Sequence, residues 1–280
     1  MTERRTDIPL QTLHLFPTLH RLLIELLHSL TPGDWQRPTI AKLWTVKDIS
    51  AHLLDGDIRG LSTSRDGFFG EQPGAINSHT DLVDFLNVLN ATWTRAARRI
   101  SPTLLIDLIE HAGTRYIDHL NTLDPFADAI FPVGWAGQDV SPNWFHIARE
   151  YTEKFLHQQQ IREAVGQQAL LTRELFFPFI DTFMYALPHT YRNVAAPEGT
   201  TIRISITTEI GGHWHLVRKG EAWLLGRSTK QPDASITIEP GDAWKLFSKS
   251  MRPEEARSRV IIEGDAALAG KALGMVSVMA

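Results

Sequence analysis

The chain of 280 residues contains no cysteine. This absence excludes disulfide bonds, metal sites built from thiolates and a cysteine nucleophile. Any thiol chemistry must therefore use a thiol that comes from outside the chain. The lack of disulfides also fits a cytoplasmic location, which we take as the expectation.

Long apolar runs and an excess of one charge are absent as well. No stretch approaches the length of a membrane span, and the first residues, MTERRTD, lack the apolar centre of a signal peptide. The formal net charge is -4, and the isoelectric point is near 6.3. We therefore expect neither a membrane nor a nucleic acid as a partner. The apolar share of 43% is typical of a globular protein.

The first two thirds of the chain repeat apolar residues at helical spacing, beginning with the leucines at 19, 22, 23, 26, 27 and 30. Thr45 is placed to cap a second helix that contains His52, with Asp48 reaching back to the cap. Further helices are predicted over residues 80–100, 102–123, 142–165 and 172–187. Loops rich in glycine and proline separate them. This pattern predicts a helical bundle.

Beyond about residue 200 the pattern changes to the period-two alternation of β-strands. Residues 201–209 and 213–218 alternate on either side of Gly211-Gly212, which predicts a hairpin. Further strands are predicted over 234–239 and 259–263, with helices from about residue 242 and over 266–275. We therefore expect a multidomain protein, with a helical domain at residues 1–190 and a small α+β domain at residues 198–280.

Three side chains could together bind a divalent metal ion. Glu153 and His157 are four residues apart in a predicted helix, so they share one helix face, and His52 lies on another helix. Two imidazoles and one carboxylate leave one coordination position open for water or substrate. A solvated helix face and a hydrogen-bonded core histidine would explain the same spacing, so the local pattern leaves both readings open.

The residues around these three resemble a known family. Trp44-Thr-Val-Lys-Asp-Ile-Ser-Ala-His52 is similar to the W-T-V-x-D-hydrophobic-x-x-H signature of the DinB-like metal-binding bundles. Glu153-Lys-Phe-Leu-His157 resembles the mycothiol-dependent maleylpyruvate isomerase branch, in which a glutamate replaces one of the usual three histidines. The run His157-Gln-Gln-Gln-Ile resembles the segment that follows the last ligand, and residues 233–265 resemble the sterol-carrier-like domain of that isomerase.

The resemblance implies a DinB-like four-helix bundle followed by a small sterol-carrier-like α+β domain. It implies His52, Glu153 and His157 as metal ligands, with zinc as the expected ion and nickel as an alternative. It also implies an external thiol such as mycothiol. This thiol would either isomerise a small electrophilic substrate that carries a carboxylate or be transferred to it. DinB-like bundles are frequently dimers, so a homodimer is among its implications.

Three further residues are candidates for the chemistry. Arg149 and Arg59 could bind the substrate carboxylate, because both are near the ligands in sequence, and Gln160 could orient a ligand. Surface positions or salt bridges within the bundle are the alternative for all three.

Two other functions stay open at this point. A metal-bound water would make the chain a hydrolase, with Glu150 or Asp55 as general base, and activity without added thiol would identify it. A protein that binds a small apolar ligand without catalysis is the second. Its cavity would be lined by aromatic residues of the small domain, namely Trp214, Trp223, Trp244 and Phe247, which otherwise form its core.

Overall fold

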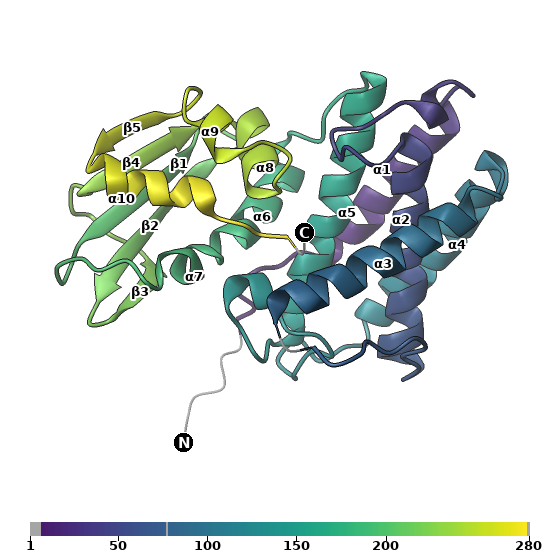
Figure 1. Cartoon of the computed structure of the whole chain (residues 1–280), viewed down its shortest axis with the longest axis horizontal. Helices are drawn as coiled ribbons and strands as arrows, with labels where there is room; N and C mark the ends of the chain where they lie inside the picture. The colour runs from purple at the N-terminus through teal and green to yellow at the C-terminus, as the bar shows by residue number, and fades with distance from the viewer. Residues whose placement is uncertain (1–6, 77, 279–280) are drawn as a thin grey trace.

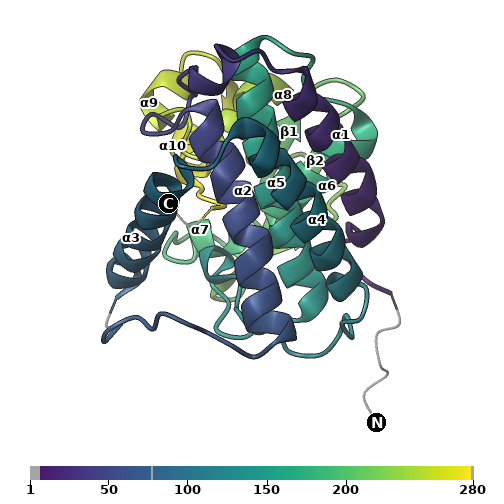
Figure 2. The same ribbon diagram turned by 90° about the vertical axis from the view of Figure 1, so that its right-hand side faces the viewer.

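The computed structural model describes residues 7–76 and 78–278 and consists of a helical part followed by a part built on one β-sheet (Figure 1). Four long helices pack together as a bundle: α1 (Phe16–Ser29), α2 (Val46–Gly60), α4 (Pro102–Leu120) and α5 (Asn143–Val165). The helix α3 (His79–Ala97) packs mainly on α2 and stands outside the bundle in Figure 2. No helix among the described residues is long and apolar enough to cross a membrane.

The helix ends follow from local capping. The side chains of Ser78, Ser101 and Thr172 accept hydrogen bonds from the first turns of α3, α4 and α6 (Arg173–Met184). Gly166 ends α5 in the left-handed conformation, with φ of 71°. A π-helical turn over Leu61–Arg65 extends α2, and short 3₁₀ turns occur at 13–15, 34–36, 134–136 and 272–274.

The sheet has five strands in the order β3-β2-β1-β4-β5. They are β1 (Thr201–Ile206), β2 (Gly212–Lys219), β3 (Ala222–Gly226), β4 (Ala234–Ile238) and β5 (Ile261–Gly264). β1 and β4 are parallel, and the other neighbouring pairs are antiparallel. The predicted hairpin is confirmed as β1 and β2, whereas β3 is a strand that the alternation did not indicate. Three short helices follow or flank these strands: α8 (Pro240–Phe247), α9 (Pro253–Ala256) and α10 (Ala266–Lys271).

The buried face of the sheet continues the core of the helical part. Residues of β1, β2 and β4 belong to the same cluster of buried apolar side chains as residues of α1, α5 and α6. Phe177 of α6 stacks on Trp214 of β2 at 5.8 Å between ring centroids, and the Trp214 indole N–H donates to Asp181 of α6 at 2.6 Å. α7 (Leu187–Tyr191) contacts β3, and the Trp223 indole N–H donates to the Val194 carbonyl.

The four aromatic residues considered for an apolar ligand site all lie in this core: Trp214, Trp223, Trp244 and Phe247. Their relative exposures are 9% or less. The rings therefore hold the sheet against the helices α6, α7 and α8. The segment that joins α7 to β1 contains the predicted domain boundary.

Candidate metal centre

The position of His52 is set by the start of α2. The Asp48 backbone N–H donates to Thr45 Oγ1 at 3.3 Å, and the Thr45 backbone N–H donates to Asp48 Oδ2 at 3.1 Å. This reciprocal pair confirms the predicted cap. Burial alone would raise the pKa of Asp48, but hydrogen bonds from Thr45 and Arg98 outweigh it and lower that pKa. His52 follows seven residues after the cap, on a long helix that packs against α5.

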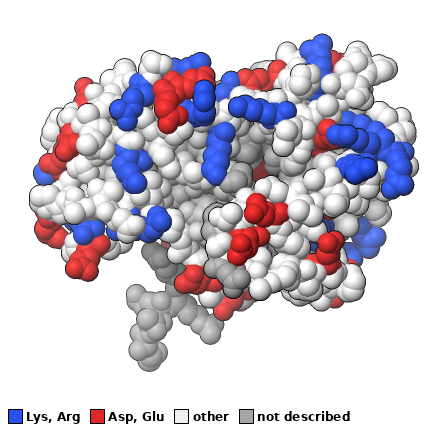
Figure 3. Space-filling model, viewed as in Figure 1, with Lys and Arg blue, Asp and Glu red and all other residues white. Residues whose placement is uncertain are grey.

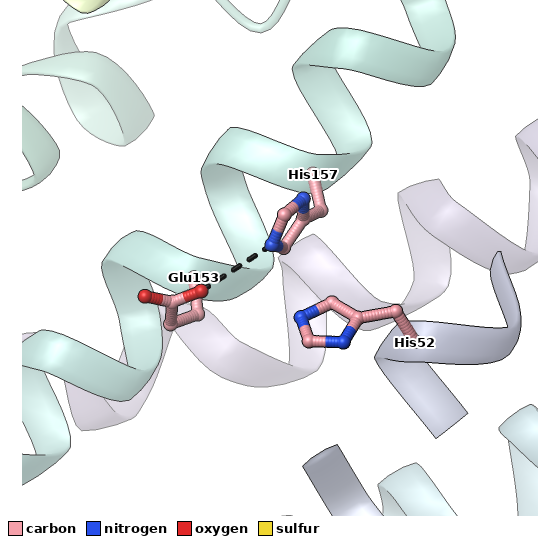
Figure 4. A group of neighbouring side chains, drawn as sticks. All are labelled: His52, Glu153 and His157. Carbon is pink, nitrogen blue, oxygen red and sulfur yellow. Dashed lines mark ion pairs between the residues drawn. The ribbon is translucent and has the colours of Figure 1, made fainter. Parts of the chain in front are cut away.

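Glu153 and His157 project from neighbouring turns of α5 toward His52 (Figure 4). One potential ligand atom from each of the three residues lies within 4.8 Å of the other two. The His157 Nε2 and Glu153 Oε2 atoms are 3.3 Å apart, and the rings of His52 and His157 have centroids 4.7 Å apart. Among the described residues this is the one group of three or more such side chains that could hold a metal ion.

Gln160 fixes which nitrogen of His157 faces the group. The His157 Nδ1 and Gln160 Oε1 atoms are 2.9 Å apart, and both side chains are buried. A carboxamide oxygen can only accept, so with Oε1 facing the ring Nδ1 carries the proton. In the neutral ring, Nε2 then presents a lone pair toward the Glu153 carboxylate. Two electron-rich atoms at this separation favour a cation between them.

His52 points its Nε2 toward Glu153 and His157 (Figure 4). Its Nδ1 lies on the other side of the ring, is buried, and has no hydrogen-bond partner among the described residues. Burial, and then the electrostatic influence of His157, Arg59 and Lys154, hold the pKa of His52 well below its usual value. The ring is therefore neutral at physiological pH, which is the form that binds metals. The indole of Trp44 packs against both imidazoles, at 4.7 Å from His52 and 5.9 Å from His157.

The donor set fits a divalent metal ion. It consists of two imidazoles and one carboxylate, with no sulfur, and the three donors come from two helices that face each other. This composition suits zinc and also nickel, and three protein ligands leave one further position for a small molecule.

Arg149 lies one turn before Glu153, within the bundle. Its guanidinium donates to Glu150 and lies 3.2 Å from His146 Nδ1, whereas its Nε has no hydrogen-bond partner among the described residues. Burial alone would lower the pKa of Arg149, but Glu150 and Glu153 outweigh it and raise that pKa. Arg149 therefore carries its charge beside Glu153, and Glu150 is already engaged as its partner.

Arg59 and Asp55 form an ion pair on α2, with Nε and Oδ2 2.9 Å apart. Asp55 is buried, and burial raises its pKa although Arg59 lowers it. Asp55, the candidate general base, is thus paired with Arg59, the candidate for substrate binding.

Sequence reasoning missed one pair of charges beside the group. Lys154, the residue after Glu153, donates to Asp57 of α2, and its Nζ also donates to the Leu53 carbonyl at 3.3 Å. Asp57 is 1% exposed. The signal in the sequence is a lysine within a helix that is buried on most sides. The sequence does not show that the partner of this lysine is Asp57, which lies on another helix.

The face drawn in Figure 3 is hollowed between the sheet part and the helical part. Lysine and arginine side chains gather along the upper edge of the hollow, and acidic side chains lie along its lower edge. In Figure 1 the helix α5 occupies the side of the bundle nearest the sheet part.

Comparison with solved structures identifies the fold. The structure is similar to that of the mycothiol-dependent maleylpyruvate isomerase, with a TM-score of 0.51 and 13% sequence identity over 85% of this chain and 90% of that chain. A variant of that isomerase with one histidine replaced by alanine gives the same TM-score and identity, over 90% of this chain and 92% of that chain. The predicted fold class, a helical bundle followed by a small α+β domain, is therefore confirmed.

A sterol carrier protein 2 like 2 from Aedes aegypti also matches part of the chain. It is 20% identical over 35% of this chain and 95% of its own, with a TM-score of 0.27. Among curated proteins no sequence matches.

The sequence model that describes the mycothiol maleylpyruvate isomerase N-terminal domain matches residues 16–162. This range is more than half of the chain and includes the helices α1 to α5 except the end of α5. It therefore contains all three members of the candidate metal centre: His52, Glu153 and His157. The chain belongs to the family of proteins that carry the mycothiol maleylpyruvate isomerase N-terminal domain.

Proposed function

We propose that this chain is a metal-dependent enzyme that uses a small external thiol, such as mycothiol. The thiol would either isomerise a small electrophilic substrate that carries a carboxylate or be transferred to it. The observation that carries the proposal is the convergence of donor atoms from His52, Glu153 and His157 within 4.8 Å. Family membership supports the thiol, and the absence of cysteine means that no residue of the chain could replace it.

His52, Glu153 and His157 would hold the ion, with zinc favoured by the nitrogen and oxygen donors and nickel as an alternative. A bound ion supplies Lewis acidity and lowers the pKa of a thiol or water in its remaining position. Gln160 would keep the His157 ring in the tautomer that offers Nε2.

Arg149 is the residue that we propose for the substrate carboxylate. It is charged, it lies one turn before Glu153, and its Nε has no partner among the described residues. A cis–trans isomerisation turns one end of the substrate while the other end is held, so a guanidinium beside the ligands would serve as the fixed point. Arg59 is the second candidate, and it forms an ion pair with Asp55 as Arg149 does with Glu150.

The metal content of the purified protein tests the proposal. Elemental mass spectrometry should find about one zinc or nickel ion per chain in the wild type, and none in Glu153→Ala or His157→Ala. His28→Ala removes an exposed imidazole at the end of α1 and should keep the ion. A wild type that binds no stoichiometric metal, even after incubation with zinc, would contradict the enzyme proposal.

The thiol is tested by assaying the metal-loaded protein with maleylpyruvate, with and without mycothiol. Turnover that requires mycothiol supports the proposal, whereas hydrolysis of ester or amide substrates without a thiol would support the metal-bound water instead. The expected homodimer belongs to the same proposal and is tested by light scattering in solution. The expected cytoplasmic location is tested by fractionation of cells that produce the protein.

A further inference from the structure

The two helices that carry the candidate ligands are joined by a buried ion pair. Lys154 of α5 directly follows Glu153, and its ammonium group contacts the Asp57 carboxylate of α2. The Asp57 side chain is 1% exposed and that of Lys154 is 17% exposed. No ligand role has been assigned to either residue, and neither belongs to the group of possible metal ligands.

The lysine also reaches the backbone beside His52. Lys154 Nζ donates to the Leu53 carbonyl at 3.3 Å, and Leu53 is the residue after His52. One ammonium group therefore contacts α2 at two points, next to His52 and one turn beyond it. The lysine itself directly follows Glu153 on α5. Lys154 thus links the two helices of the candidate centre through positions adjacent to Glu153 and to His52.

We propose that Lys154 and Asp57 are positioning residues that set the spacing and rotation of α2 against α5, and hence the geometry of the metal centre. A charged pair favours one distance and direction between its two groups, whereas contacts between leucine side chains tolerate small displacements of the helices. Because the Asp57 side chain is buried, a shift of either helix would leave its charge without its partner, which is strongly unfavourable. The inference rests on the proposed metal site.

The test compares the double variant Lys154→Met/Asp57→Asn with the wild type. The replacements keep approximate size and remove both charges together, so neither is left unpaired. Zinc affinity is measured by competition with a chromophoric chelator, and the ligand geometry by the visible absorption of the cobalt-substituted protein. Unfolding temperature is recorded in parallel. We expect a loss of zinc affinity of about 10- to 100-fold and a changed cobalt spectrum.

Lys245→Met is the matched control. Lys245 of α8 forms an ion pair with Glu163, which is also on α5 but lies beyond the ligands. Its removal should leave zinc affinity and the cobalt spectrum unchanged, although it too deletes an ion pair to α5. Equal affinities and spectra in the double variant and the wild type would overturn the inference.

Two further measurements keep the result decisive. If the double variant does not fold, Lys154→Arg, which keeps the charge but lengthens the link, should still alter the cobalt spectrum, and an unaltered spectrum counts against the inference. Crystal structures of the metal-free proteins test it without any metal. The ring separation of 4.7 Å between His52 and His157 should persist in the wild type and Lys245→Met and change in the double variant. Metal binding by the wild type decides the proposed function, and the difference between variants decides this inference.

Discussion

Gly60, the last residue of α2, lies directly against the ring of Tyr116 on α4. A Cβ atom at Gly60 would collide with that ring, which is 2% exposed and has no room to move. The close approach of α2 and α4 therefore depends on the absence of a side chain at this position.

Gly60→Ala should for this reason destabilise the protein by about 1–3 kcal/mol, because a buried ring must shift to admit the methyl group. Gly56→Ala is the matched control on the same helix. No atom lies within 4 Å of its added Cβ, so it should raise the unfolding free energy by up to about 1 kcal/mol through helix propensity. Urea denaturation of both variants checks the prediction, and equal effects would contradict it.

Replacement of Gln160 tests its role behind His157. Gln160→Leu removes the acceptor for Nδ1, which leaves the tautomer unfixed and should weaken zinc binding by about 10- to 100-fold. Gln160→Glu keeps an acceptor and should retain binding. Competition with a chelator measures both. Gln159 is a suitable control, because its Oε1 accepts from the Leu170 backbone N–H at 2.8 Å and not from a candidate ligand.

Removal of the metal should lower the stability of the whole chain, because the ion binds only when α2 and α5 are packed. At a free zinc concentration about 100 times the dissociation constant, the expected gain in unfolding free energy is about 2.7 kcal/mol. Thermal unfolding with zinc and with EDTA measures the difference. Glu153→Ala should show no response to either addition, and a response equal to that of the wild type would place the binding elsewhere.

Acid should destabilise the protein through His146. Burial, and then the charge of Arg149, lowers the pKa of His146 from 6.5 to about 4, although Glu150 acts against this shift. The unfolded chain therefore binds the proton first as the pH falls. The contribution of His146 to the free energy of unfolding is fully present above pH 6.5. It is lost as the pH falls toward 4, which lowers the free energy of unfolding by about 3 kcal/mol.

His146→Gln, compared with the wild type by urea denaturation at several pH values, measures that contribution. The difference in unfolding free energy between the two proteins should shrink as the pH falls from 6.5 to 4. A difference that stays constant over this range would show that His146 is not responsible.

Local features of the sequence predicted most of the helical part. The cap of α2 by Thr45 and Asp48 needs only residues that are close in sequence, and it was predicted with its partner. The start of α5 was predicted within one residue, because Pro142 precedes it and a long helical pattern follows. The closing helix ends at Lys271 instead of about 275, since Gly270 and Gly274 weaken it and a 3₁₀ turn takes over.

Features that depend on partners far along the chain were not predicted. The strand β3 has adjacent leucines at 224 and 225, so it lacks alternation, and it forms because β2 offers it an open edge. The side chains of Lys154 and Arg149 are only 17% and 18% exposed, which the sequence alone did not indicate. Asp57, which pairs with Lys154, is 97 residues away in sequence. Only the packing of α2 on α5 brings them together.

The apolar core runs from α1 through α6 into β1 and β4 without a break. The surfaces through which the two parts meet are apolar, and separating the parts would expose Phe177 and Trp214 to water. The sheet part is thus not an attachment that could be exchanged for another module by cutting at the segment between them. Recombination within the family would have to transfer α6, α7 and the sheet together as a single cassette.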